Sequence, residues 1–217
     1  YGGINCYIFL KAVNAFALGA PFSVFLALIM LLMIGAPIIV RFLEGYGHES
    51  PACLLAIAGY SWLGVVFLVF SLSLAVDIYH LFVTAAGMLL QRDLSSIVPE
   101  DRVTLASSFL IACIGMVYGY FRAMLIDKET LHITSPKIPR DIGTLTIVQI
   151  SDIHLGLIVR EKRLARILRR VTDAAPDILI STGDLVDGQI DKLSGLAEPF
   201  QTIKPRYGKF AIMGNHE

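Results

Sequence analysis

The first 121 residues are dominated by long apolar stretches that no charged residue interrupts. Three of these stretches are about as long as the roughly 20 apolar residues that an α-helix needs to cross a bilayer. A signal peptide is a poor explanation, because its apolar region is shorter and would not recur three times. We therefore predict membrane-spanning helices at residues 21–40, 53–76 and 104–121, and interpret residues 1–10 as the tail of an earlier span.

Beyond residue 121 the apolar residues follow the shorter periods of a soluble α/β domain. Short runs bounded by turn residues predict strands at residues 131–134, 145–150, 178–180 and 210–213. From Leu164, apolar residues at i, i+3, i+4 and i+7 predict an amphipathic helix, and a weaker helical pattern covers 191–203. Strands that alternate with helices predict parallel pairing, so we expect a βαβαβ arrangement in this part of the chain.

The distribution of charge supports a division of the chain into two parts. Ten of its 36 Asp, Glu, Lys and Arg residues lie in 1–121, and the mean hydropathy of the whole chain is +0.68. We predict an α-helical transmembrane anchor at 1–126, followed at 127–217 by the first half of an α/β domain that is incomplete at its C-terminus. The formal net charge is zero, which gives no reason to expect nucleic acid as a partner.

Two groups of charged residues leave alternatives open. Asp77 and His80 share a helix face, and within a membrane they would indicate a proton or ion path. The simpler interpretation is that Asp77 marks the membrane surface and that 78–91 lie along it as an interfacial helix. The basic residues at 162–170 are typical of a solvated helix face, with contact to anionic lipid headgroups as the alternative. Lys and Arg in the loops slightly favour a cytoplasmic position for the C-terminal part.

Three polar motifs follow the last three predicted strands. They are Asp152-x-His154, Gly183-Asp184-x-x-Asp187 and Gly214-Asn215-His216-Glu217. The carboxyl ends of parallel strands meet at one edge of a sheet, where ligands bind in such folds. Carboxylate, imidazole and amide groups gathered at that edge would suit divalent metal ions. Chance is a poor explanation for three such motifs in this order and spacing.

These motifs resemble the signature of the calcineurin-like metallophosphoesterases, and the resemblance covers roughly 130–217. The flanking sequences match as well, at 148–156 and at 207–213. The apolar segments in front make the chain similar to the bacterial branch of this family that carries a multi-span N-terminal anchor. The resemblance thus implies an integral protein of the bacterial inner (plasma) membrane, with membrane lipids among its partners.

The resemblance also implies roles for individual residues. Asp152 and His154 would bind the first of two divalent metal ions, Asp184 would bridge both, and Asn215 would bind the second. His216 would be the catalytic residue, in contact with the scissile phosphate or protonating the leaving oxygen. Mixed Asp, His and Asn ligands favour Mn, Fe or Zn over Ca, and they are compatible with Mg.

The implied function is hydrolysis of phosphomonoester, phosphodiester or pyrophosphate bonds by a two-metal mechanism at a membrane, with a lipid-linked envelope compound as an attractive substrate. The family completes its site with later histidines, typically in a Gly-x-His-x-His stretch, which these 217 residues lack. We therefore interpret the chain as a fragment of a longer protein and expect it to be inactive alone. One alternative is a non-catalytic interaction or regulatory module on the same fold. Another is a transporter or sensor, for which Asp77 and His80 are the support.

Overall fold

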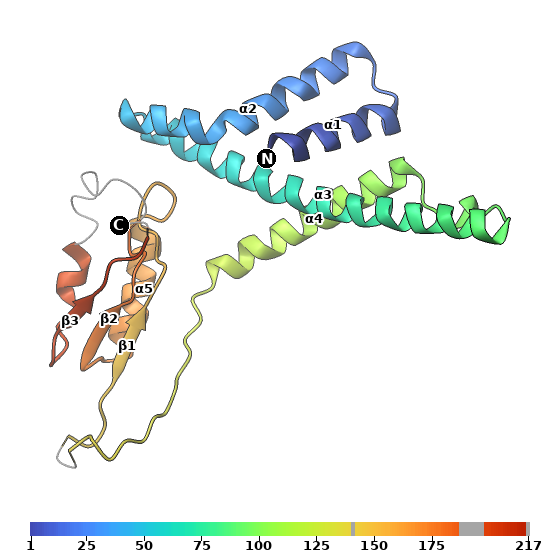
Figure 1. Ribbon diagram of the computed structural model, residues 1–217. Coiled ribbons are helices and arrows are strands. Elements are labelled where there is room, and N and C mark those ends of the chain that lie inside the picture. The colour runs from blue at the N-terminus through green and yellow to red at the C-terminus, as the bar shows by residue number, and fades with distance from the viewer. Residues whose placement is uncertain (140–141, 187–197, 216–217) are drawn as a thin grey trace. The chain divides into compact units, whose positions relative to one another are not determined.

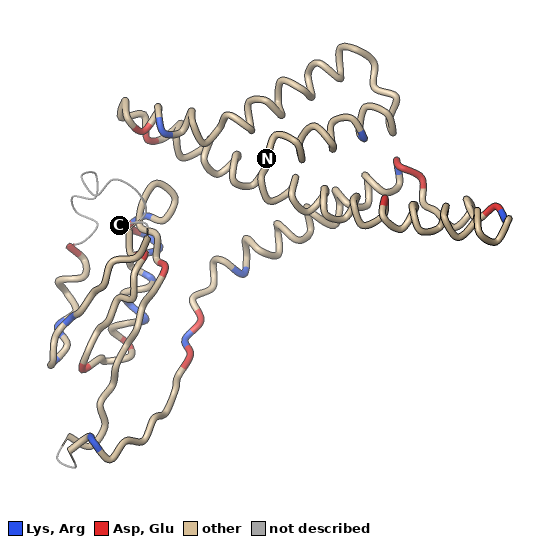
Figure 2. Tube along the Cα trace, in the orientation of Figure 1, with Lys and Arg blue, Asp and Glu red and all other residues tan. Residues whose placement is uncertain are grey.

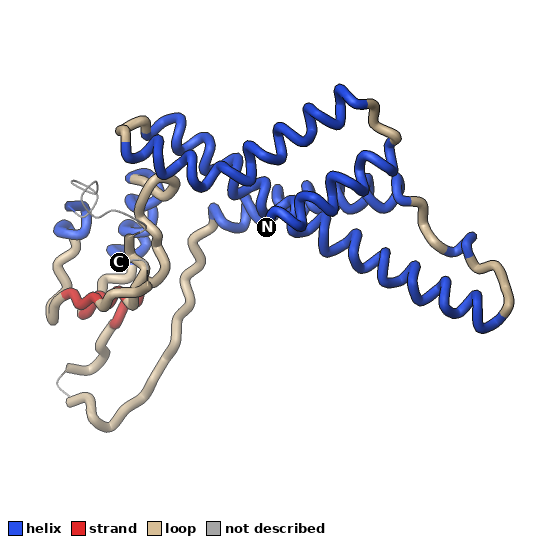
Figure 3. Tube along the Cα trace, turned by 45° about the horizontal axis from the view of Figure 1, so that its top comes forward, coloured by secondary structure: helices blue, strands red, loops and turns tan. Residues whose placement is uncertain are grey.

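The computed structural model describes residues 1–139, 142–186 and 198–215. The chain divides into two compact units, Tyr1–Leu125 and Ile126–Glu217. The first unit is helical, and the second contains a small sheet with helical segments (Figures 1 and 3).

The first unit consists of four α-helices and one short 3₁₀ helix. In chain order they are α1 (Gly2–Phe16), α2 (Ala20–Gly45), α3 (Glu49–Leu90), η1 (Ser95–Ile97) and α4 (Asp101–Met124). Among the described residues, three helices are long and apolar enough to cross a membrane: α2, α3 and the segment that ends with α4. Large apolar side chains on these helices, including Phe22, Leu54 and Leu110, are more than half exposed. Such an apolar surface suits a lipid environment and not water.

Helices α2 and α3 pack closely because small residues line their contact. Ala36 of α2 and Ala52 and Ala56 of α3 are almost fully buried. A Cβ atom added to Gly59 would lie 2.9 Å from the Cβ of Ala36, so the backbones approach nearer than a larger side chain would allow. Close approach through small residues is a usual way to join helices that a hydrophobic driving force cannot hold together in lipid.

Helix α3 continues without a break past Asp77. It has 42 residues, which corresponds to about 63 Å at 1.5 Å per residue. The separate interfacial helix expected at 78–91 is therefore the end of α3, since neither proline nor glycine interrupts 77–86. The carboxylate of Asp77 is paired with Lys11 of α1, and the Tyr7 hydroxyl donates a hydrogen bond to it at 2.5 Å. The ion pair with Lys11 and the hydrogen bond from Tyr7 thus connect Asp77 to α1.

The second unit contains a parallel three-stranded sheet in the order β1-β2-β3. Its elements are β1 (Ile147–Ile150), α5 (Glu161–Asp173), β2 (Ile178–Ser181), η3 (Glu198–Thr202) and β3 (Lys209–Ala211). Ile147 pairs with Ile178, and Leu179 pairs with Lys209. Apolar helices followed by a parallel α/β region confirm the predicted fold class.

Two predicted elements differ from the structure. The strand expected at 131–134 does not form, and Leu131 and Ile133 are 76% and 81% exposed. Alternation of apolar and polar residues predicts a strand only where a neighbouring strand supplies hydrogen bonds, and these residues have none. Of the helix expected at 191–203, residues 191–197 lie outside the described residues, while Glu198–Thr202 form a 3₁₀ turn.

The core of the second unit lies between α5 and one face of the sheet. Leu164, Leu168 and Val171 form the buried stripe of α5, with Leu164 fully buried. They belong to one apolar cluster with Leu179 of β2 and Ile203, and with residues of the loop after β1. This packing fixes the loop that follows β1, which carries the first of the polar motifs.

Candidate metal centre

The candidate ligands lie on two adjacent loops at the carboxyl edge of the sheet. Pairing between β1 and β2 continues beyond the strands, because the loops that follow them exchange backbone hydrogen bonds. The N–H of Asp152 donates to the carbonyl of Gly183 at 3.2 Å, and the N–H of His154 donates to the carbonyl of Asp184 at 3.0 Å. Leu155, which is buried in the core, donates to Leu185 at 2.9 Å. The relative positions of the two loops are thereby fixed by the backbone.

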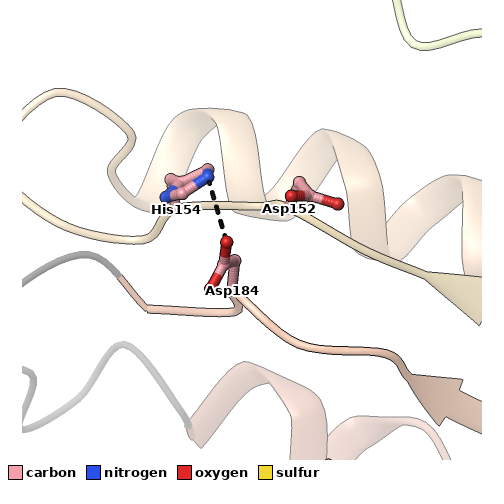
Figure 4. A group of neighbouring side chains, drawn as sticks. All are labelled: Asp152, His154 and Asp184. Atoms are coloured by element: carbon pink, nitrogen blue, oxygen red, sulfur yellow. Dashed lines mark ion pairs between the residues drawn. The ribbon is translucent and has the colours of Figure 1, made fainter. Parts of the chain in front are cut away.

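Asp152, His154 and Asp184 point toward a common volume between these loops (Figure 4). One ligand atom from each residue lies within 4.8 Å of the others. His154 Nε2 lies 4.0 Å from Asp184 Oδ2, and these side chains are 34% and 14% exposed. The predicted convergence of these three residues is therefore present in the structure.

The three donors fit a divalent ion. Two ligand atoms that are each about 2.1 Å from one ion lie at most about 4.2 Å apart, so adjustments of less than about 1 Å would complete the coordination. Imidazole nitrogen with carboxylate oxygen suits Zn, Fe or Mn, since imidazole favours the first two and carboxylates favour Mn and Mg. The chemistry of the donor set and its spacing agree.

All three candidate ligands have a left-handed backbone conformation. The φ angles of Asp152, His154 and Asp184 are 52°, 50° and 48°. Such conformations cost of the order of 1–3 kcal/mol each for residues other than glycine, and they cluster at functional sites. The described part of the chain has six non-glycine residues with positive φ, so half of this strained set coincides with the candidate ligands.

The loop after β3 presses directly against Asp184. A Cβ atom added to Gly214 would lie 2.6 Å from the backbone nitrogen of Asp184, and one added to Gly183 would lie 3.0 Å from the Cα of Gly214. Gly183 also has a φ of 108°, which favours glycine. The two glycines thus let the second and third strand ends touch. Each glycine directly precedes a predicted ligand, but the sequence carries no signal that these two loops touch.

The structure gives less information on the other predicted site residues. Asn215 follows Gly214 and is exposed, at the end of the described residues. His216, the predicted catalytic residue, lies outside the described residues, as does Asp187. Ser151 is an addition, because its hydroxyl donates to Asp152 Oδ2 at 2.5 Å and so orients that carboxylate. The roles of Asn215 and His216 remain predictions.

Comparison with protein families finds a match for the residues that carry this site. Residues 145–217 match the model of the calcineurin-like phosphoesterases. This part of the chain is therefore similar to the calcineurin-like metallophosphoesterases, a family of hydrolases, and the match supports the resemblance seen in the sequence.

Individual relatives extend the match toward the apolar segments. A transmembrane protein with metallophosphoesterase domain from Danio rerio is 35% identical over 138 residues, which are 60% of this chain and 31% of that protein. An uncharacterized metallophosphoesterase from Aquifex aeolicus is 37% identical over 110 residues, 50% of this chain and 41% of the relative. Another, from Bacillus subtilis, is 37% identical over 76 residues, 34% of this chain and 27% of the relative.

The chain thus covers well under half of the length of these relatives. No solved structure matches it significantly.

Proposed function

We propose that the chain is part of a membrane-anchored, metal-dependent phosphoesterase that hydrolyses phosphomonoester, phosphodiester or pyrophosphate bonds. The observation that carries this proposal is the convergence of Asp152, His154 and Asp184 at the carboxyl edge of the sheet, within residues that match a hydrolase family. Membership of the family alone would be weaker support, because a fold does not determine function.

In this proposal each side chain has a role that suits its chemistry. Asp152 and His154 would hold one ion, and Asp184 would help to hold both ions, because its carboxylate offers two oxygens. Asn215 would hold the second ion through its amide oxygen, and His216 would contact the phosphate or protonate the leaving oxygen. When bound, divalent ions supply polarisation of the phosphoryl oxygens and activation of water at neutral pH.

The proposed domain organisation is an anchor at 1–126 and a catalytic part at 127–217. The three helices that are long and apolar enough to cross a membrane support this anchor. A relative whose name includes the word transmembrane supports it as well. An anchored site would meet substrates close to the membrane surface, so we propose a phosphoester that is lipid-linked. Basic residues are slightly more frequent in the loops on the same side of the membrane as the catalytic part, which favours a cytoplasmic position for that part.

The test is hydrolysis by the full-length protein in detergent with Mn²⁺, using an aryl phosphodiester as a generic substrate. We expect turnover in the unchanged protein and a loss of at least about a hundredfold in Asp184→Asn, as is usual when a ligand of a catalytic metal is removed. Asp173→Asn is the matched control, since Asp173 is an exposed carboxylate at the end of α5.

Two results would contradict the proposal in different ways. Equal turnover in Asp184→Asn and the unchanged protein would show that the site is assigned wrongly. No turnover on any phosphoester together with no bound metal would favour a non-catalytic interaction module on the same fold.

A further inference from the structure

Basic residues are concentrated in and directly before α5. Six of the 18 Lys and Arg residues of the chain lie within 160–170, and Figure 2 shows them gathered along this helix. The six are Arg160, Lys162, Arg163, Arg166, Arg169 and Arg170. One acidic residue, Glu161, lies among them. No comparable density of one charge occurs elsewhere in the sequence.

Four of these residues form a stripe along the face of α5 opposite to the core. Lys162, Arg166, Arg169 and Arg170 are spaced at i, i+4, i+7 and i+8, which places them on one side of a helix. All four are exposed, while Leu164, Leu168 and Val171 on the other side are buried against the sheet. We call these four residues the basic stripe. Asp173 lies at its C-terminal end and leaves the stripe strongly positive.

We propose that the basic stripe binds anionic lipid headgroups of the membrane in which the chain is anchored. The proposal rests on the membrane anchoring argued above, and it does not depend on catalysis. Residues 125–146 connect α4 to β1 without a helix or strand in their described part, so α5 is joined by a continuous chain to the proposed membrane anchor. A tether of this kind raises the effective concentration of a second binding surface without any new contact.

Charge complementarity favours this partner over the others. Each basic residue close to an anionic membrane surface raises the affinity of the protein for that membrane roughly fivefold. A stripe of four such residues therefore has a large combined effect. Proteins that bind single-stranded nucleic acid interleave aromatic side chains with basic ones, and 160–173 contain no aromatic residue. A plain solvated helix face requires no such concentration of a single charge.

The test compares the full chain in nanodiscs of phosphatidylcholine with the full chain in nanodiscs that also contain phosphatidylserine at 30%. Hydrogen–deuterium exchange is measured for peptides that cover α5. We expect exchange in α5 to be at least tenfold slower with anionic lipid, and we expect 0.5 M NaCl to abolish this protection, because salt screens exposed charges.

Two triple variants separate the stripe from total charge. Lys162→Gln/Arg169→Gln/Arg170→Gln should lose the lipid-dependent protection. Lys128→Gln/Lys137→Gln/Lys204→Gln removes the same charge from exposed residues elsewhere in the second unit and should keep it. Asp184→Asn should keep it as well, so that a failure of the proposed hydrolysis is distinguishable from a failure of lipid binding.

Several outcomes would overturn the proposal. Equal exchange of α5 in both types of nanodisc would show a solvated face. Equal loss of protection in both triple variants would show an effect of net charge. Protection by added single-stranded RNA, with none by anionic lipid, would assign the stripe to nucleic acid.

Discussion

The backbone conformation of single residues positions the candidate ligands Asp152, His154 and Asp184. Each has a positive φ angle, and the first two are held by backbone hydrogen bonds to the loop after β2. The surrounding loops thus hold the three ligand atoms close together through the backbone. Such an arrangement would reduce the reorganisation that ion binding requires.

Gly214→Ala tests the contact between the loop after β3 and Asp184. The added methyl group would lie within 2.6 Å of the Asp184 nitrogen, so the loop that carries Asp184 must shift. Overpacking of this kind typically costs about 1–3 kcal/mol, and we expect Mn²⁺ affinity to fall roughly tenfold to a hundredfold, measured by calorimetry.

Gly119→Ala is the matched control for this substitution, because nothing lies within 4 Å of a Cβ atom added at Gly119. Its Mn²⁺ affinity should equal that of the unchanged protein. An unchanged affinity in Gly214→Ala would mean that the contact with Asp184 is irrelevant to metal binding.

The sequence predicted the identity of the three converging residues but not their geometry. Asp152, His154 and Asp184 were recognisable because each follows a short apolar run that reads as a strand, and strand ends of a parallel sheet share an edge. Left-handed φ angles at Asp and His carry no signal of their own, since the residue types that tolerate them also occur in ordinary turns. The role of Gly214 required knowledge of which loops touch.

The packing of α5 is the central feature of the second unit at the scale of elements. Leu164→Ala would leave a cavity in a fully buried position and should destabilise this unit by about 2–5 kcal/mol. Hydrogen exchange of β1 and β2 in the full chain should accelerate accordingly. Leu131→Ala, the same change at a residue that is 76% exposed, should have an effect below about 0.5 kcal/mol. Similar effects of the two substitutions would contradict the core described for α5.

Charged residues join three helices of the first unit. Lys11 of α1 pairs with Asp77 of α3 and, at 3.1 Å, with Asp101 of α4. Lys11 is 10% exposed in its side chain, whereas Asp77 and Asp101 are 37% and 63% exposed. Removal of one partner of a buried ion pair lowers the stability of the fold more than replacement of both partners by apolar residues does.

Lys11→Met should therefore loosen α1, and the double variant Lys11→Met/Asp77→Leu should restore part of the loss. The single tryptophan, Trp62 of α3, donates to Asn5 of α1 at 3.0 Å and reports this contact by fluorescence. We expect a lower thermal midpoint for the single variant in detergent, and an unchanged one for Lys128→Met. A double variant less stable than the single one would contradict the ion-pair interpretation.

Elements whose apolar pattern meets a packing partner in the same unit were predictable, and a pattern without such a partner was not. α5 and β2 combine a clear apolar pattern with a partner surface in the same unit. The pattern at 131–134 was as clear locally, but strand formation depends on a neighbour that the local pattern does not specify. The continuity of α3 past Asp77 was not predictable from the local sequence, because the partner of this charge, Lys11, comes from a distant part of the chain.

The uneven distribution of charge along the sequence predicts the division of the whole chain into two units. Its two compact units meet at Leu125 and Ile126, close to the point where charged residues become frequent. Composition indicates such a division because a lipid-facing surface excludes charge and a water-facing surface requires it. The same uneven distribution places a third of the basic residues on and next to one helix, which is the basis of the proposed contact with lipid.

Metal content is the measurement that tests the central claim most directly. The full-length protein is purified with Mn²⁺, dialysed, and its metal determined by mass spectrometry, together with Asp184→Asn and the control Asp173→Asn. We predict two ions per chain for the unchanged protein and the control. Asp184→Asn should lose at least one ion, because this variant lacks the carboxylate that would help to hold both. Equal metal content in all three proteins, or none in any of them, would contradict a metal centre at these strand ends.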